Sequence, residues 1–254
     1  MKNLKCIAAL LLAVALLCGL AACGGETQPE ETEAETTAAT EPSTTEPETT
    51  EPETTEPETT EAPTTTEAEP TENETLSGLD LGTIDGNTYT NETLALRCEL
   101  GDSWYVYSEA ELASLLGIVA DSFSDTVIGD AVENSQSVTV FFAMDTTTYG
   151  NINIAVSKNS MPSLSEENFV ALMVPQMKPL LEQSGFEDVT CTEAAFEFAG
   201  QNHTGIDITA TVQGMTVYER QVYLTVDSCM YVVTATAYEE NGAQAMLDIF
   251  TALN

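Results

Sequence analysis

The sequence predicts an α+β domain over residues 76–254, in which an antiparallel sheet carries helices on its faces, preceded by a disordered tether. Every aromatic residue of the chain lies in this part, so only here can a sizeable core form. Apolar and polar residues alternate in several segments, which is the two-residue period of half-buried strands. The last of these segments are joined by short turns, and short connections favour antiparallel pairing.

The first strand is predicted at residues 94–100, where four apolar side chains alternate with small or charged ones. A turn at Gly101-Asp102 leads into the aromatic segment 104–107. Ser108 and Glu111 then have the spacing of a capping box, in which the serine accepts from the new helix and the glutamate reaches back. The apolar face of this helix is predicted from Leu112, Leu115, Leu116 and Val119, with an interruption at Gly117.

Residues 137–145 and 151–157 are predicted to form a strand pair joined by a polar turn. The segment 163–166 (Ser-Leu-Ser-Glu) caps a second helix. Pro175 and Pro179 predict that this helix is kinked or split, because proline lacks the backbone N–H. Its apolar stripe is predicted from Phe169, Leu172, Met173, Leu180 and Leu181.

Four further strands and a closing helix complete the expected fold. The strands are predicted at residues 189–198, 206–212, 216–226 and 230–238, with turns at Gln213-Gly214 and Asp227-Ser228. The helix is predicted at residues 243–253. Its inward-facing residues are Met246, Ile249, Phe250 and Leu253.

The N-terminus has the pattern of an export signal over residues 1–22. Lys2 and Lys5 precede an apolar run, Cys6 to Leu20, which is too short for a comfortable transmembrane helix. Leu20-Ala21-Ala22-Cys23 resembles the lipobox of bacterial lipoproteins. The resemblance implies lipid attachment at Cys23, and hence a membrane anchor on the outer face of the bacterial cytoplasmic membrane. The alternative is ordinary secretion with a cysteine there by chance.

Residues 23–75 are predicted to form a disordered acidic linker. The stretch from Glu26 to Thr75 holds 17 glutamates and no base, and it lacks the branched aliphatic and aromatic residues that a core requires. Glu-Pro-Glu-Thr-Thr repeats three times from Glu46 to Thr60. Proline and like charge favour an extended chain. Either a stalk that lifts the domain off the bilayer or a simple solvated spacer fits this composition.

The net charge excludes two classes of partner. The chain has 42 acidic and 6 basic residues, a formal net charge of −36, and only four of the bases lie in residues 76–254. Nucleic-acid recognition needs clustered Lys and Arg, and so does binding to anionic lipid headgroups. We therefore expect no nucleic acid as a partner.

The opening of the domain resembles PsbP-like domains, which occur in lipoproteins of gut Firmicutes and in the related DcrB group. The resemblance rests on Tyr89-Thr90-Asn91, then Gly101-Asp102-Ser103-Trp104 leading into Tyr107-Ser108-Glu109, and on Ala199-Gly200 before three long strands. The Pro-x-Gly-Trp pattern common in the family lacks its proline here. The resemblance implies an antiparallel sheet sandwiched by helices (an α/β/α sandwich) and mostly non-catalytic binding or accessory roles.

No catalytic residue, cofactor site or metal site is predicted. His203 is the only histidine, and its polar, glycine-flanked segment favours an exposed turn over a catalytic role. No Gly-x-Ser-x-Gly, zinc-ligand or phosphate-loop pattern is present. One loop offers oxygen ligands for weak Ca²⁺ binding, although its spacing does not match an EF-hand, and a solvated loop is the favoured interpretation. Its residues are Asp80, Asp85, Asn87 and Glu92.

Cysteines and aromatic residues are interpreted as structural. Cys98, Cys191 and Cys229 lie in predicted strands among apolar neighbours, which favours buried thiols over the one disulfide that could form. Packing in the core and at its rim is likewise favoured over ligand binding for the aromatic residues. These are Trp104, Tyr105, Tyr107, Tyr218, Tyr223, Tyr231 and Tyr238.

The function predicted from these observations is a non-enzymatic binding or accessory domain displayed on a lipid anchor, with an unknown protein or cell-wall partner. The alternative is an extracellular hydrolase that uses carboxylates on wall or environmental glycans, which would place two carboxylates face to face in a cleft. A transport receptor is disfavoured because the domain is too short for two lobes.

Overall fold

A computed structural model describes residues 76, 78–116, 125–134 and 136–253 of the chain. The predicted signal peptide, Cys23 and the predicted linker over residues 23–75 lie outside the described residues, so they stay predictions. None of the helices in the described ranges is long and apolar enough to span a membrane.

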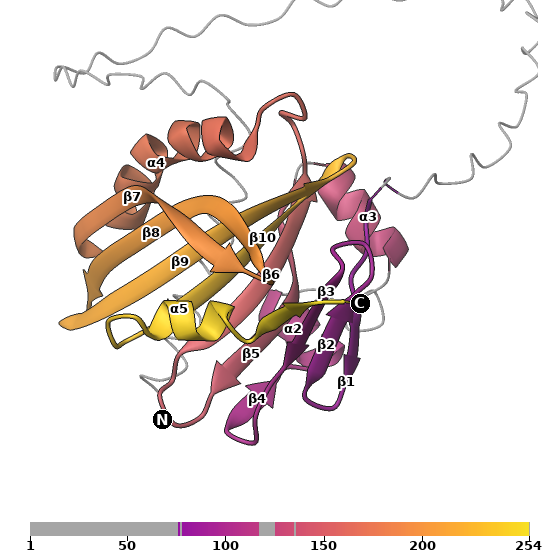
Figure 1. The fold of residues 1–254 in the computed structure, drawn as a ribbon, viewed down its shortest axis with the longest axis horizontal. Helices are drawn as coiled ribbons and strands as arrows, with labels where there is room; N and C mark the ends of the chain where they lie inside the picture. The colour runs from indigo at the N-terminus through magenta and orange to yellow at the C-terminus, as the bar shows by residue number, and fades with distance from the viewer. Residues whose placement is uncertain (1–75, 77, 117–124, 135, 254) are drawn as a thin grey trace, which may run out of the picture. The chain divides into compact units, whose positions relative to one another are not determined.

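The main element of the fold is a seven-stranded sheet in the order β4-β5-β6-β10-β9-β8-β7 (Figure 1). Each neighbouring pair is antiparallel, which confirms the pairing expected from the short connections. Six of its strands were predicted, with boundaries shifted by up to five residues, and β4 forms in the aromatic segment after the Gly101-Asp102 turn. The seven strands are β4 (Trp104–Val106), β5 (Val138–Asp145), β6 (Asn151–Lys158), β7 (Glu187–Phe198), β8 (Gln201–Val212), β9 (Met215–Val226) and β10 (Cys229–Ala237).

A second, four-stranded antiparallel sheet has the order β1-β2-β3-β11. Its strands are β1 (Thr83–Asp85), β2 (Thr88–Asn91), β3 (Leu96–Glu99) and β11 (Phe250–Ala252). The prediction of a helix over residues 243–253 is therefore wrong in its second half. Helix α5 (Gly242–Leu247) ends early because the residues after it pair with β3, which gives that strand a second partner and buries Phe250.

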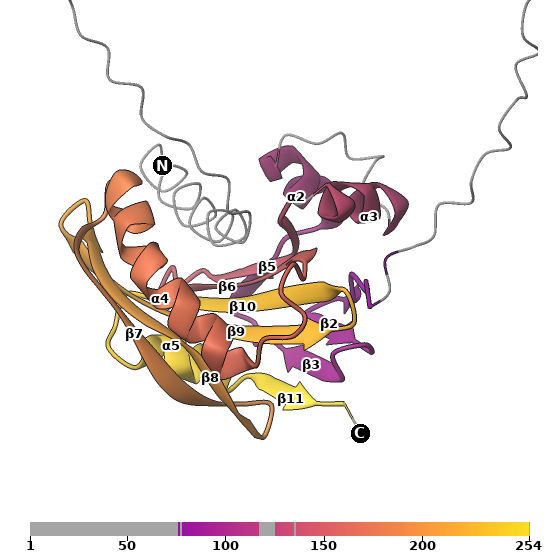
Figure 2. The ribbon, with the colours of Figure 1, turned by 90° about the horizontal axis from the view of Figure 1, so that it is seen from above.

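The small sheet and α5 pack on one face of the large sheet, and α2 (Glu109–Leu116) and α4 (Glu166–Gln183) pack on the other. Figure 2 shows α2 and α3 (Asp125–Glu133) on one side of strands β5, β6 and β10, with β2, β3 and β11 on the other. The capping box of α2 is confirmed, since Ser108 N–H donates to Glu111 Oε2 over 2.9 Å. Helix α3 was not predicted. The α+β class, with antiparallel strands and helices packed on them, is confirmed, and the small sheet is an addition to the expected layers.

Helix α4 (Glu166–Gln183) runs through both of its prolines as one helix, so the predicted split is wrong. Pro175 and Pro179 are four residues apart and both exposed, so the carbonyl groups that lose an N–H partner face water. Ser165 is the N-cap and accepts from Asn168 N–H. The buried side of the helix is made by Phe169, Val170, Met173, Met177 and Leu181.

Two main clusters of buried side chains lie on the two faces of the large sheet. One includes the apolar face of α4 together with Ile206 and Ile208 of β8. The other, larger cluster joins the sheet to Cys98 of β3 and Phe250 of β11. A smaller cluster pairs Leu112 of α2 with Phe142 of β5.

The cysteines of the domain are unpaired thiols. Cys98 and Cys229 are buried and Cys191 is half-buried, which confirms the interpretation of Cys98 and Cys229 as buried thiols. Burial raises the pKa of Cys98 to about 12 and that of Cys229 to about 11. Because the thiolate is the nucleophile, neither is suited to catalysis.

Most aromatic residues of β4 and of the late strands pack in the core or at its rim, as predicted, whereas Tyr105 is exposed and its ring meets that of Tyr107 edge-on. Trp104 packs against the large cluster. The ring of Tyr107 meets that of Phe142 edge-on, with centroids 4.8 Å apart. Tyr223 and Tyr231 are buried.

Candidate functional site

The strands β8 and β9 separate at Gly205. Their pairing ends at the pair Gly205–Val222. Beyond this point β8 stays paired with β7, and β9 stays paired with β10. The last residues of β9 (223–226) therefore run without β8 beside them. The two strands approach closely at the point where the separation begins. A Cβ at Gly205 would lie only 2.1 Å from the Gln221 carbonyl oxygen.

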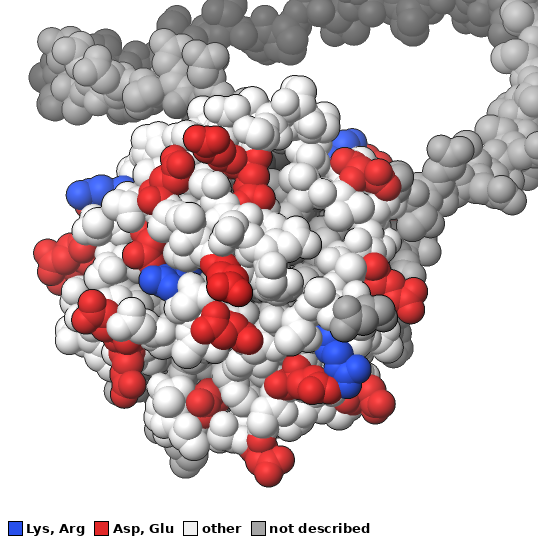
Figure 3. Space-filling view, in the orientation of Figure 1, with Lys and Arg blue, Asp and Glu red and all other residues white. Residues whose placement is uncertain are grey.

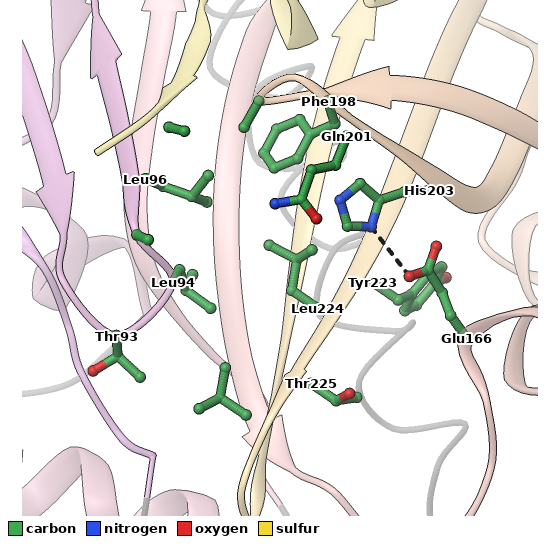
Figure 4. A pocket seen from close by; sticks show the side chains of 14 residues that line it. Thr93, Leu94, Leu96, Glu166, Phe198, Gln201, His203, Tyr223, Leu224 and Thr225 are labelled. Atoms are coloured by element: carbon green, nitrogen blue, oxygen red, sulfur yellow. Dashed lines mark hydrogen bonds and ion pairs between the residues drawn. The ribbon is translucent and has the colours of Figure 1, made fainter. Parts of the chain in front are cut away.

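A pocket of about 290 Å³ occupies this opening (Figure 4). One wall is apolar and contains Leu94 and Leu96 from the small-sheet side. Leu224 of β9 lies in the middle of the view, and the opposite wall carries Gln201 and His203 of β8. The pocket thus combines apolar contact area with hydrogen-bonding groups on one side, which is typical of small-molecule sites.

His203 and Glu166 form the polar pair of this pocket. Nδ1 of the imidazole lies 3.1 Å from Glu166 Oε2, and the two side chains are 15% and 31% exposed. The other carboxylate oxygen accepts the backbone N–H of Thr204. Glu166 therefore holds the ring in place and favours a hydrogen on Nδ1, which leaves Nε2 directed away from the glutamate, on the side of Gln201 (Figure 4).

The first turn of α4 places Glu166 for this contact. Since Ser165 caps the helix, Glu166 is its first residue, and the helix N-terminus favours a negative charge there. Helix α4 packs on β7 and β8, which brings its start beside His203. The edge of the imidazole ring also meets Phe198, with ring centroids 5.9 Å apart.

The sequence predicted His203 as an exposed turn residue, and this is wrong. The turn lies three to four residues before His203, at Ala199 and Gly200, whose φ angles are 49° and 78°. Gln201 already begins β8, so His203 is a strand residue whose side chain is largely covered. The Ala-Gly pair was the signal in the sequence that could have placed it. Nothing in the sequence pointed to Glu166 as its partner.

The face of the domain shown in Figure 3 carries more acidic than basic side chains. Each lysine and arginine in the described ranges forms an ion pair with a carboxylate: Arg97 with Glu99, Lys158 with Glu133, Lys178 with Glu182 and Arg220 with Asp207. The pocket lining contains neither lysine nor arginine. An anionic ligand would thus meet Glu166 without a lysine or arginine beside it, so the site disfavours anionic ligands.

The pocket contains an ordered base but no assembled nucleophile. Thr93 and Thr225 line it, yet among the described residues no hydroxyl or thiol is hydrogen-bonded to His203. Covalent catalysis requires that contact. Glu166 is the one carboxylate in the lining, so this pocket does not hold the facing pair that a carboxylate-dependent hydrolase uses.

The loop considered for Ca²⁺ has a structural role. Asp80 accepts from the backbone N–H groups of Gly82 and Thr93, at 2.8 and 3.1 Å, and so closes its own loop. Asn87 donates to the Gly101 carbonyl oxygen. In the described part of the chain, no three His, Cys, Asp or Glu side chains come together as a metal site.

Comparisons with known proteins bear on the fold. No family model matches the chain, and no curated protein is similar to it in sequence. Among solved structures it is similar to the cyanobacterial PsbP protein (CyanoP) of Synechocystis, at 9% identity and a TM-score of 0.41, over 68% of this chain and 98% of that one. It is also similar to a Pseudomonas aeruginosa protein of unknown function, at 16% identity and a TM-score of 0.25, over 37% of this chain and 61% of that one. The expected likeness to a PsbP fold is therefore found, and what the pocket binds has to be inferred from its own residues.

Proposed function

We propose that this chain is a lipoprotein on the outer face of the cytoplasmic membrane, whose folded domain binds a small uncharged ligand in the pocket of His203. The observation that carries the binding role is the Glu166-oriented imidazole, whose Nε2 has no hydrogen-bond partner among the described residues and faces a partly apolar pocket. The export pattern and the lipobox-like residues before Cys23 support the anchored location.

A binding role fits this geometry better than hydrolysis. The imidazole can accept or donate one hydrogen bond through Nε2, Gln201 can do both, and the leucines contact an apolar ligand body. A ligand that offers one hydrogen-bonding group on a small apolar ring or chain matches this set. The volume suits about ten non-hydrogen atoms, for which dissociation constants in the millimolar to micromolar range are expected.

The pocket is tested with phenol and benzamide as probes, followed by NMR of the imidazole. Since the chain has one histidine, its ring signals report on this site alone. Both probes should shift the Nε2 signal, and His203→Gln should weaken probe binding about tenfold, the value of one hydrogen bond to an ordered partner. Asn202→Ala is the matched control, because Asn202 neighbours His203 in β8 and points to the opposite face. Unshifted ring signals at saturating probe, or equal loss in both variants, would contradict the assignment.

The anchor is tested separately by Cys23→Ala. We expect this variant to lose incorporation of labelled fatty acid and to move from the membrane to the soluble fraction, because two acyl chains are needed for stable attachment. Cys18→Ala is the control, since it removes a cysteine from the apolar run upstream and should keep the label. Unchanged labelling of the Cys23 variant would rule the anchor out without affecting the pocket.

A further inference from the structure

The large sheet carries a polar strip in the middle of one face. Its residues belong to four adjacent strands, β5, β6, β10 and β9, and cross-strand register places six of them opposite one another. One row joins Asn151, Thr236 and Glu219, and the next joins Asn153, Thr234 and Gln221. The polar strip consists of Thr139, Asn151, Asn153, Ser157, Glu219, Gln221, Thr234 and Thr236.

Apolar clusters lie on both sides of the polar strip. Each row continues toward β8 with Ile206 or Ile208, which pack with α4. In the other direction the rows continue with Phe142 or Met144 of β5, which pack with α2. The sheet face is therefore apolar where these two helices cover it and polar between them.

The polar strip is buried, and it contains most of the buried polar side chains in the described ranges. Asn153 and Thr234 are 1% exposed, and no strip residue exceeds 4%. Apart from these eight, Asn91 is the one other buried polar residue in the part of the chain that the structure describes. Glu219 accepts from Gln221 and Thr236, so part of the strip is hydrogen-bonded internally.

Six buried oxygen atoms on this face have no hydrogen-bond partner among the described residues. They are Thr139 Oγ1, Asn151 Oδ1, Asn153 Oδ1, Ser157 Oγ, Thr234 Oγ1 and Tyr238 Oη. Folded proteins leave few such atoms, because burying one without a partner destabilises the fold. Six on one face indicate partners supplied from outside the sheet.

We infer that the polar strip is a second binding site, for an uncharged ligand with several hydroxyl groups, of the saccharide class. Hydroxyls of Thr and Ser, amides of Asn and one carboxyl group can donate to and accept from sugar hydroxyls, each of which does both. The strip includes no lysine, arginine or histidine, so an anionic ligand would have no counter-charge.

The test uses the full chain in detergent, with maltose, cellobiose and N-acetylglucosamine as probes and isothermal titration calorimetry as the measurement. Thr234→Val and Asn153→Leu keep the side-chain volume and remove a polar atom. We expect each to weaken saccharide binding at least tenfold and to raise the melting temperature of the ligand-free protein by about 3 °C, since an unpaired buried atom is removed. Thr209→Val, a half-buried threonine of β8 outside the strip, is the matched control and should change neither.

Four outcomes would overturn the inference. One is the absence of heat from all three sugars at tens of millimolar, which would assign the unpaired atoms to ordered water. Another is equal affinity in the wild type and in Thr234→Val. The third is loss of saccharide binding in His203→Gln, which would place the sugar in the pocket. Glucuronate should bind more weakly than the neutral sugars, and stronger binding would also contradict the site.

Discussion

Replacing Gly205 with alanine is expected to destabilise the domain by about 3 kcal/mol, an effect at the upper end for overpacking in a well-packed region. The added Cβ would lie 2.1 Å from the Gln221 carbonyl oxygen and 2.7 Å from a carbon of the Phe196 ring. The first of these atoms is backbone in the middle of the sheet, so it cannot move without breaking the ladder. Phe196 is also fixed, since it is buried and Arg220 lies 4.9 Å above its ring.

The measurement is urea unfolding, in which the midpoint should fall while the slope stays unchanged. Gly101→Ala is the control, because a Cβ there meets nothing within 4 Å and its φ is not positive. Gly101→Ala should change the free energy of unfolding by no more than about 0.5 kcal/mol. Equal stability of the two variants would mean that β8 and β9 are farther apart at Gly205 than the structure has them. The description of the strand separation beside the pocket would then be wrong.

Glu219 is expected to make the domain less stable as the pH rises from about 4.5 to about 7. Burial raises the pKa of its carboxyl group to about 7, although hydrogen bonds from Gln221 and Thr236 act in the opposite direction. In the unfolded chain the group titrates near 4.5. Between these values the folded state holds a proton that the unfolded state has released, so the free energy of unfolding falls as the pH rises.

The free energy of unfolding is expected to fall by about 3 kcal/mol. The fall begins near pH 4.5 and is complete above pH 7. Glu219→Gln should remove it, because the amide keeps the shape and one acceptor without a charge. The difference in unfolding free energy between the two proteins, measured from pH 4 to pH 8, should therefore grow in favour of the variant. Glu193→Gln, at an exposed position of β7, should give a difference that does not vary in this way. A constant offset for Glu219→Gln would show that the carboxyl group is not buried.

Most elements of the fold could be predicted from the sequence, because their signals are local. The alternation in the late strands and the capping box at Ser108 each specify an element within a few residues. The C-terminal strand could not be predicted this way. Ile249, Phe250 and Leu253 fit a helical stripe as well as a strand, and the choice depends on β3, about 150 residues earlier in the chain.

The two candidate sites could not be predicted from the sequence, for a different reason. His203 and Glu166 are 37 residues apart and meet only because α4 packs on β8. In the polar strip, the alternation Asn151-Ile152-Asn153-Ile154 is visible in the sequence, but alternation assigns the polar side to water. Strand order instead brings the polar rows together in the middle of the sheet, because β10 pairs with β6, and there they are buried.

The pairing of β11 with β3 also determines when during synthesis the domain can complete its folding. A chain is made from its N-terminus, and the three residues that complete the small sheet follow every other strand of both sheets. Until they arrive, β3 has an open edge and the place of Phe250 between the sheets is vacant. The domain therefore cannot complete its folding before residues 250–252 have been synthesised. A protein from which these residues were removed would lack the fourth strand of the small sheet.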